Sequence, residues 1–247
     1  MPGSNEILIA AASFAAGAVA AVAGFGIGSI LTPLLSVWVG TRLAVAAVSV
    51  PHLAATLLRF LMLRSRVDRR VLLHFGVLSA AGGLGGALLH AAASNPALTI
   101  MFAALLMFAG TAGLTGFMRR VRLGPRAAWL AGAVSGLFGG LVGNQGGIRS
   151  AALLGFGLGR QEFVATATAI GLVVDAARMP VYFATAGGEL WGMWRLIAVS
   201  TACALAGTLF GTRVLRRIPE QAFHRVVGVL LLALGLFMLW RAVESPG

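Results

Sequence analysis

Long apolar stretches are the feature that most limits how this chain can fold. A helix that crosses the hydrocarbon core of a bilayer needs roughly 20 apolar residues. Eight stretches approach that length, at about 6–24, 43–63, 71–91, 97–117, 127–143, 162–184, 192–212 and 222–241. Helices satisfy their own backbone hydrogen bonds in lipid, so we predict an all-α integral membrane protein.

The composition leaves no material for a soluble domain of useful size. Of the 247 residues, 59% are hydrophobic and 11% are charged, and the mean hydropathy is +0.93. Soluble domains are typically about 45–50% apolar and about 25% charged. We therefore expect residues 1–247 to form a single multi-pass membrane domain in the lipid bilayer of the cell inner (cytoplasmic) membrane. The first residues lack the positive start of a signal peptide, so we expect the first apolar stretch to be retained.

The basic residues mark one side of the membrane. The net charge is +12, and all 19 basic residues are arginines. They cluster between apolar stretches, at 64–70, 119–126 and 213–217. Such clusters are typical of cytoplasmic loops. They do not form one polar face, so we expect no nucleic-acid partner.

Two shorter apolar stretches, at about 29–40 and 147–158, differ from the long ones. Each directly follows a glycine cluster, and each is too short for a perpendicular crossing. We interpret both as broken or re-entrant helices. The predicted architecture is therefore about eight long transmembrane helices plus two glycine-broken short ones.

An internal repeat relates the two halves of the chain, about 6–117 and about 127–242. Gly17–Gly24 matches Gly132–Gly139, Arg59 aligns with Arg178, and a later glycine pair recurs. The loop after Leu63 is basic and the next one is uncharged, whereas in the second half the loop expected at 185–190 carries only Glu189 and the following loop is basic. This exchange predicts inverted copies, as in many secondary transporters. It requires an odd number of crossings per copy, and purely re-entrant short segments would instead give parallel copies.

The glycine breaks are the best sequence pointer to a transporter's binding site. A helix that begins inside the membrane presents free N–H groups and the positive end of its dipole, and both favour an anion. In the second half the candidate anion-binding residues form one run, Asn144, Gln145, Gly146, Gly147 and Arg149. The competing interpretation is a flexible loop with Arg149 reaching the lipid headgroups. The counterparts in the first half are Gly26, Gly28 and Ser29.

The repeat-related helices carry further ionisable residues, which usually face a cavity or a partner at this depth. Arg59 and Arg178 are candidate anion-binding residues, and His52 and Asp175 are candidate proton-linked residues. Each also has a purely structural alternative: Asp175 and Arg178 neutralise each other, Arg59 extends toward the nearby basic loop, and His52 is a hydrogen-bonded core histidine.

Other chemistry finds little support in the sequence. We expect His74, His90 and His224 near helix ends at the membrane interface, and their spacing does not suit a metal. There is no GxxxxGK[ST] run for ATP. We expect no metal, no cofactor and no enzyme activity.

The chain resembles a known family. The run Gly-Ile-Gly-Ser-Ile-Leu-Thr-Pro-Leu-Leu at 26–35, the run Gly-Leu-Val-Gly-Asn-Gln-Gly-Gly at 140–147 and the two-fold repeat are similar to the TauE/SafE group of sulfite exporters. The resemblance implies a permease for sulfite, organosulfonates or related small anions. The alternative from another class is a non-transporting membrane scaffold. The sequence does not fix the oligomeric state, and a homodimer is one option.

Overall fold

The computed structural model describes residues 2–24, 26–116, 125–144, 146–154, 156–214 and 220–244, which contain helices and no strand. The helices are α1 (Pro2–Ala23), α2 (Ile27–Leu63), α3 (Arg69–Val71), α4 (Val77–Ala92), α5 (Asn95–Thr115), α7 (Pro125–Val142), α8 (Gly146–Leu154), α9 (Arg160–Gly192), α10 (Trp194–Val214) and α11 (Glu220–Glu244). Every long apolar stretch of the sequence overlaps one of them. The all-helical prediction is therefore confirmed.

Within the described residues, five helical segments are long and apolar enough to cross a bilayer, namely Ile27–Arg66, Arg69–Ala92, Asn95–Thr115, Gln161–Gly192 and Trp194–Arg213. The outward faces of the bundle keep large apolar side chains exposed; among them are Leu61, Leu88, Phe210 and Trp240. A water-soluble protein rarely exposes so much contiguous apolar surface, whereas lipid accepts it. The protein is thus a multi-pass membrane protein.

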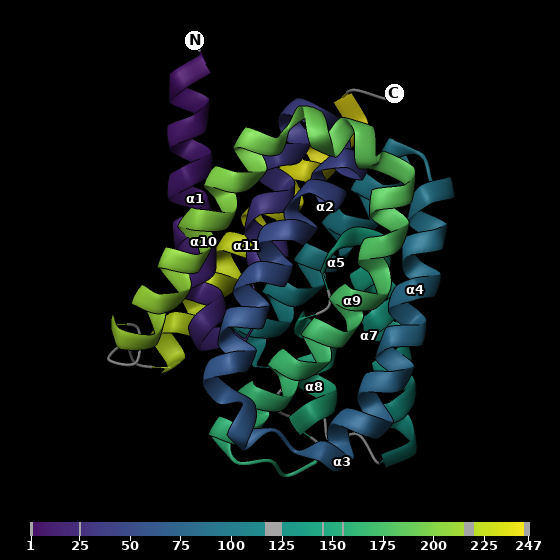
Figure 1. Ribbon diagram of the computed structural model, residues 1–247, viewed down its shortest axis with the longest axis vertical. Helices are drawn as coiled ribbons and strands as arrows, with labels where there is room; N and C mark the ends of the chain where they lie inside the picture. The colour runs from purple at the N-terminus through teal and green to yellow at the C-terminus, as the bar shows by residue number, and fades with distance from the viewer. Residues whose placement is uncertain are drawn as a thin grey trace.

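Glycine allows the helices of the two halves to pack backbone against backbone. α1 packs on α10, α4 on α7 and α5 on α11, and α2 and α9 pass through the middle of the bundle (Figure 1). A Cβ atom on Gly82 would lie 2.1 Å from the carbonyl oxygen of Ala133, and one on Gly207 would lie 1.9 Å from that of Phe14. Small residues at such contacts are what let membrane helices approach closely.

The described members of the three basic clusters lie at one end of the bundle. The 3₁₀ turn Arg64–Arg66 and α3 lie at the bottom of Figure 1. α7 packs parallel to α4, because Gly82 meets Ala133 and Gly86 meets Leu137, so Arg126 lies at the same end. α11 runs antiparallel to α5 (Gly110 lies against Gly228, and Gly235 against Ala103), which brings Arg213 at the end of α10 there too. Residues 119–122 and 216–217 lie outside the described residues.

The helix breaks at glycine occur at the positions predicted from the sequence. Gly24, Gly26 and Gly143 have φ of 77°, 137° and 73°, values that residues with a Cβ rarely adopt. A second break at Gly40, with φ 76° and ψ 158°, divides α2, so the first short segment is 27–40 rather than 29–40. The second short segment, α8, ends at Leu154 instead of the expected 158.

One predicted loop is wrong. The loop expected at 185–190 is helical, because α9 continues to Gly192 despite Pro180 and two glycines. Lipid offers no competing hydrogen-bond partner, so glycine interrupts a membrane helix less than it would a helix in water.

Candidate functional site

The two broken segments meet at the centre of the molecule, backbone to backbone. A Cβ atom on Gly28, in the first turn of α2, would lie 2.3 Å from the carbonyl oxygen of Gly143, which precedes α8. Gly26, Ser29 and Gly146 are buried there, and Gly147 lies in the first turn of α8. Gln145 lies outside the described residues. The first N–H groups of a helix have no intrahelical acceptor, so both helix starts bring free donors to one place.

Polar side chains without partners surround this contact. The Nδ2 atom of Asn144 and the Oγ1 atom of Thr32 are buried and have no hydrogen-bond partner among the described residues. Thr32 Oγ1 and Arg178 Nη1 would lie 3.9 Å and 3.7 Å from a Cβ placed on Gly143. Buried polar groups are nearly always hydrogen-bonded in folded proteins, so these free groups point to an absent ligand.

Two buried arginines extend to the C-terminal end of α1. Arg59, on α2, is 2% exposed and donates to the carbonyl oxygen of Ala20 and, at 3.3 Å, to Thr56 Oγ1. Arg149, on α8, is 3% exposed and donates at 3.5 Å to the carbonyl oxygen of Gly24. The Nε atom of Arg59 and the Nε and Nη1 atoms of Arg149 have no partner among the described residues.

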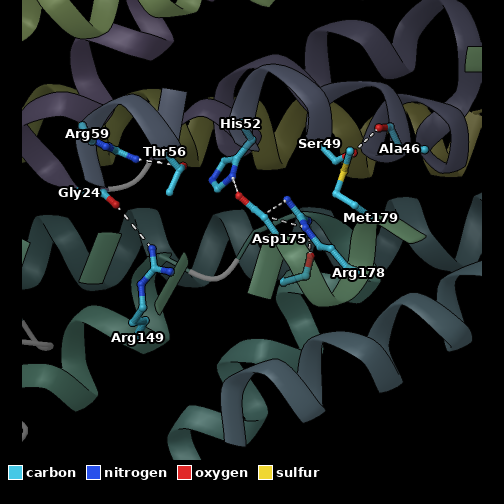
Figure 2. A network of polar contacts seen from close by, with 11 residues as sticks. Gly24, Ala46, Ser49, His52, Thr56, Arg59, Arg149, Asp175, Arg178 and Met179 are labelled. Carbon is cyan, nitrogen blue, oxygen red and sulfur yellow. Dashed lines mark hydrogen bonds and ion pairs between the residues drawn. The ribbon is translucent and has the colours of Figure 1, made fainter. Parts of the chain in front are cut away.

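The two guanidinium groups lie near each other. Gly24 donates its N–H to Ala20 O at 3.0 Å, so the two arginines bond carbonyls one helical turn apart. A Cβ on Gly171 would lie 3.0 Å from Arg149 Nη1 and 3.6 Å from Thr56 Cγ2, which brings Arg149 close to the residue that Arg59 contacts. In Figure 2, the side chain of Arg59 points toward Thr56 and that of Arg149 points toward Gly24.

A buried ionic network joins α2 to α9 beside the arginines. Ser49, His52, Thr56 and Arg59 are spaced three and four apart, so they share one face of α2 (Figure 2). His52 Nδ1 lies 2.7 Å from Asp175 Oδ2, and the other carboxylate oxygen of Asp175 lies 2.8 Å from Arg178 Nη2. One carboxylate therefore serves a histidine from the first half and an arginine from the second.

Arg178 also fixes the end of α7. Its Nη1 atom donates at 2.5 Å to the carbonyl oxygen of Gly139, and the hydroxyl of Tyr182, one turn later on α9, donates to that of Gly140. These two bonds hold the last turns of α7 immediately before the break at Gly143. Arg178 thus has partners on every side that the structure describes, unlike Arg59 and Arg149.

The buried charges do not balance within the described part of the chain. Among the residues whose burial is described, Arg59, Arg149 and Arg178 are buried guanidinium groups, whereas Asp175 is the one buried carboxylate. Asp175 is already shared by His52 and Arg178. The positive charges of Arg59 and Arg149 are therefore uncompensated, and a small anion is the ligand that suits such a site.

The structure contradicts the alternative placements of Arg149 and Arg59 that the sequence left open. Arg149 does not reach the headgroups and Arg59 does not extend toward the basic loop, because both guanidinium groups are buried. His90 lies in the last turn of α4, near a helix end as expected, and is buried there: it is 2% exposed, and its ring nitrogens lie 2.8 Å and 3.1 Å from the carbonyl oxygens of Leu141 and Arg42. His74 is exposed, and the side chain of His224 lies outside the described residues.

Sequence reasoning missed the most informative contact, the bond between His52 and Asp175. The two residues are 123 positions apart, and no local signal pairs them. The sequence offered one indication: the two residues lie near the middle of two helices that the repeat relates to each other. The described residues bring no three His, Cys, Asp or Glu side chains together in a metal-binding group.

Comparison with known proteins gives one match. The family model described as Sulfite exporter TauE/SafE matches residues 9–238, nearly the whole chain. Comparisons with curated proteins and with solved structures gave no match.

Proposed function

The chain belongs to the TauE/SafE family of sulfite exporters, and from this premise we propose that it is a secondary transporter for sulfite, organosulfonates or related sulfur-containing anions. The proposed site lies between the two broken helices. We propose that three kinds of group bind the anion there. They are the helix starts at Gly26, Gly28, Ser29, Gly146 and Gly147, the side chains of Asn144 and Gln145, and the arginines Arg59 and Arg149. Arg178 contributes positive potential and holds α7 in place.

The observation that carries the proposal is the pair of buried guanidinium groups without a counterion. Burying an unpaired charge in a membrane interior is expensive, and such residues generally mark substrate or ion pathways. A bound oxyanion compensates both charges. Guanidinium groups also suit this ligand geometrically, because their planar donors match the oxygens of an oxyanion two at a time.

The helix end of α1 accounts for only part of what holds these arginines. The carbonyls of Ala20 and Gly24 lie at the negative end of the α1 dipole, which favours cations. They accept from one edge of each guanidinium and leave the Nε atom of Arg59 and two nitrogens of Arg149 free. We infer that the carbonyls orient the arginines while the free edges bind substrate.

The packing supports inverted repeats for the two halves. α1 lies on α10 and α4 lies on α7, so the first helix of each half packs on the third long helix of the other. Arg59 bonds the end of α1, and its sequence counterpart Arg178 bonds the end of α7. If α1 and the segment 27–40 enter and leave the membrane on the same side, they do not count as a crossing. The first half then crosses three times, through 41–63, α4 and α5. Three is odd, so re-entrant tips and inverted halves are compatible.

The membrane potential can drive export when the anion, together with any proton that accompanies it, carries net negative charge. An inside-negative potential favours outward movement of an anion by about 2.3 kcal/mol per charge per 100 mV. Direct use of ATP is therefore not required by the physics.

Replacement of Arg149 tests the site. In proteoliposomes, we expect Arg149→Gln to lose exchange of radiolabelled sulfite, because removing one partner of a buried charged contact costs about 2–5 kcal/mol, roughly thirty-fold or more in affinity. Arg70→Gln, at an exposed position of α3, is the matched control and should exchange sulfite normally. Normal exchange by folded Arg149→Gln would remove Arg149 from the site. Failure of the wild-type protein to move any sulfur anion, with stable co-purification of a partner, would favour the scaffold alternative.

A further inference from the structure

His52 stands at the junction between the ionic network and the uncompensated arginines. Its ring extends from α2 between Thr56 and Asp175 (Figure 2). One ring nitrogen, Nδ1, lies 2.7 Å from the carboxylate of Asp175. Along the same face of α2, Thr56 follows after one turn and Arg59 after two. The side chain retains 9% exposure, while that of Asp175 has none.

The second ring nitrogen, Nε2, is free to take a proton. Among the described residues, the ring is hydrogen-bonded only through Nδ1. Asp175 accepts hydrogen bonds from Arg178 through its other oxygen, so its carboxylate is ionised and acts only as an acceptor. Nδ1 must then carry the hydrogen of a neutral His52, which leaves the lone pair on Nε2. Histidine is also the side chain whose charge ordinarily changes near neutral pH.

We infer that a proton is the co-substrate of the anion site and that His52 takes it up at Nε2 when the anion binds. This inference rests on the proposed function. It identifies the coupling ion, and it gives the unpaired nitrogen a role that a core histidine would not have.

The surrounding charges give the sign of the coupling. Asp175 favours the protonated ring, whereas Arg59, Arg149 and Arg178 oppose it; Tyr182 is neutral and bonds a carbonyl. The other helices packed on α2 carry charged residues only within two turns of their ends (α1, α10 and α11) or none (α5). An anion between Arg59 and Arg149 offsets the opposing charge, so it raises the proton affinity of His52. By reciprocity, a proton on His52 strengthens anion binding.

The number of protons taken up with sulfite tests the inference. Calorimetric titration of the purified protein with sulfite, near neutral pH in two buffers of different ionisation enthalpy, gives that number directly. Protons exchanged by sulfite itself are common to all variants, so the difference between variants isolates the side chain. We expect His52→Gln to take up about one proton fewer than the wild type. His74→Gln, an exposed histidine stacked on Trp129, should match the wild type. Equal proton numbers in wild type and His52→Gln would overturn the inference.

A second measurement covers the case in which His52→Gln does not fold. In wild-type protein with isotopically labelled histidine, sulfite should shift the His52 imidazole signal toward the protonated form, with the other three histidines assigned by single substitution. An unchanged signal at saturating sulfite would refute proton uptake while leaving the anion site intact. If the wild type binds no sulfite at all, the proposed function fails as well.

Discussion

A single methyl group at Gly28 is expected to disrupt the site without removing any of its polar groups. Gly28 and Gly143 touch through their backbones at the point where the two broken helices meet. A Cβ on Gly28 would lie 2.3 Å from the carbonyl oxygen of Gly143, whereas ordinary contacts begin at 3.4 Å. The Cβ position is fixed by the backbone of residue 28 and the oxygen belongs to the main chain of Gly143, so no side-chain rotation relieves the overlap. Gly28→Ala must therefore move one helix tip by about 1 Å from the other.

The cost of this displacement follows from what surrounds it. Overpacking of one methyl group in a closely packed interior costs about 1–3 kcal/mol. If the displaced tip carries its donors away from the anion, the affinity falls by about one to two orders of magnitude, since about 1.4 kcal/mol corresponds to tenfold. The tip also precedes Thr32 on the same helix, so a shift of α2 moves a second unpaired polar group.

Thermal unfolding in detergent, with and without sulfite, measures both effects. We expect Gly28→Ala to unfold at a lower temperature than the wild type and to gain little stability from sulfite, because ligand stabilisation depends on affinity. Gly85→Ala is the matched control, since a Cβ there has no atom within 4 Å and alanine favours the helix. A Gly28→Ala protein with wild-type stability and wild-type stabilisation by sulfite would refute the close contact of the two tips.

Two further predictions concern the ionic network and the orientation of the halves. Asp175→Asn leaves Arg178 buried without its carboxylate, so we expect about 3–5 kcal/mol of destabilisation, measured by thermal unfolding, and recovery in the double variant Asp175→Asn/Arg178→Gln; a stable single variant would contradict the pairing. For the orientation, single cysteines replacing Arg66 and Arg213 in a Cys203→Ala background should react with an impermeant thiol reagent from the same side of the membrane, because the two residues lie at one end of the bundle. Labelling from opposite sides would exclude the inverted arrangement.

The sequence is most informative where lipid imposes a requirement on each residue by itself. Apolar stretches of helix length mark α4, α5 and α10 because each turn must be tolerated by hydrocarbon. The breaks at Gly26 and Gly143 are also readable, because a positive φ needs glycine whatever the partner. The ends of helices are harder to predict. α9 continues through Gly187 and Gly188, because a glycine inside a membrane helix does not by itself end the helix.

Partnerships across the bundle were beyond sequence reasoning, since they depend on how the helices cross. Arg178 pairs with Asp175 on its own helix, and spacing alone suggests this. The bond of His52 to the same carboxylate depends on the depth at which α2 and α9 meet. Likewise, nothing near Arg59 in the sequence indicates that Ala20, 39 positions earlier, supplies its acceptor. His90 is another case, because its burial against Arg42 and Leu141 could not be read from the sequence around it.

The contact of Gly28 with Gly143 bears on how fast the protein can work. A constriction closed by a side chain opens by a rotamer change, which takes picoseconds to nanoseconds. If the anion passes between the two broken helices, as proposed, two main chains close its path. A whole helix tip must then move, and collective motions of that kind take microseconds to milliseconds. Turnover is therefore limited to about 10³–10⁶ events per second by backbone motion alone. Such a ceiling suits a carrier that handles its cargo one ion at a time, and it is incompatible with an open pore.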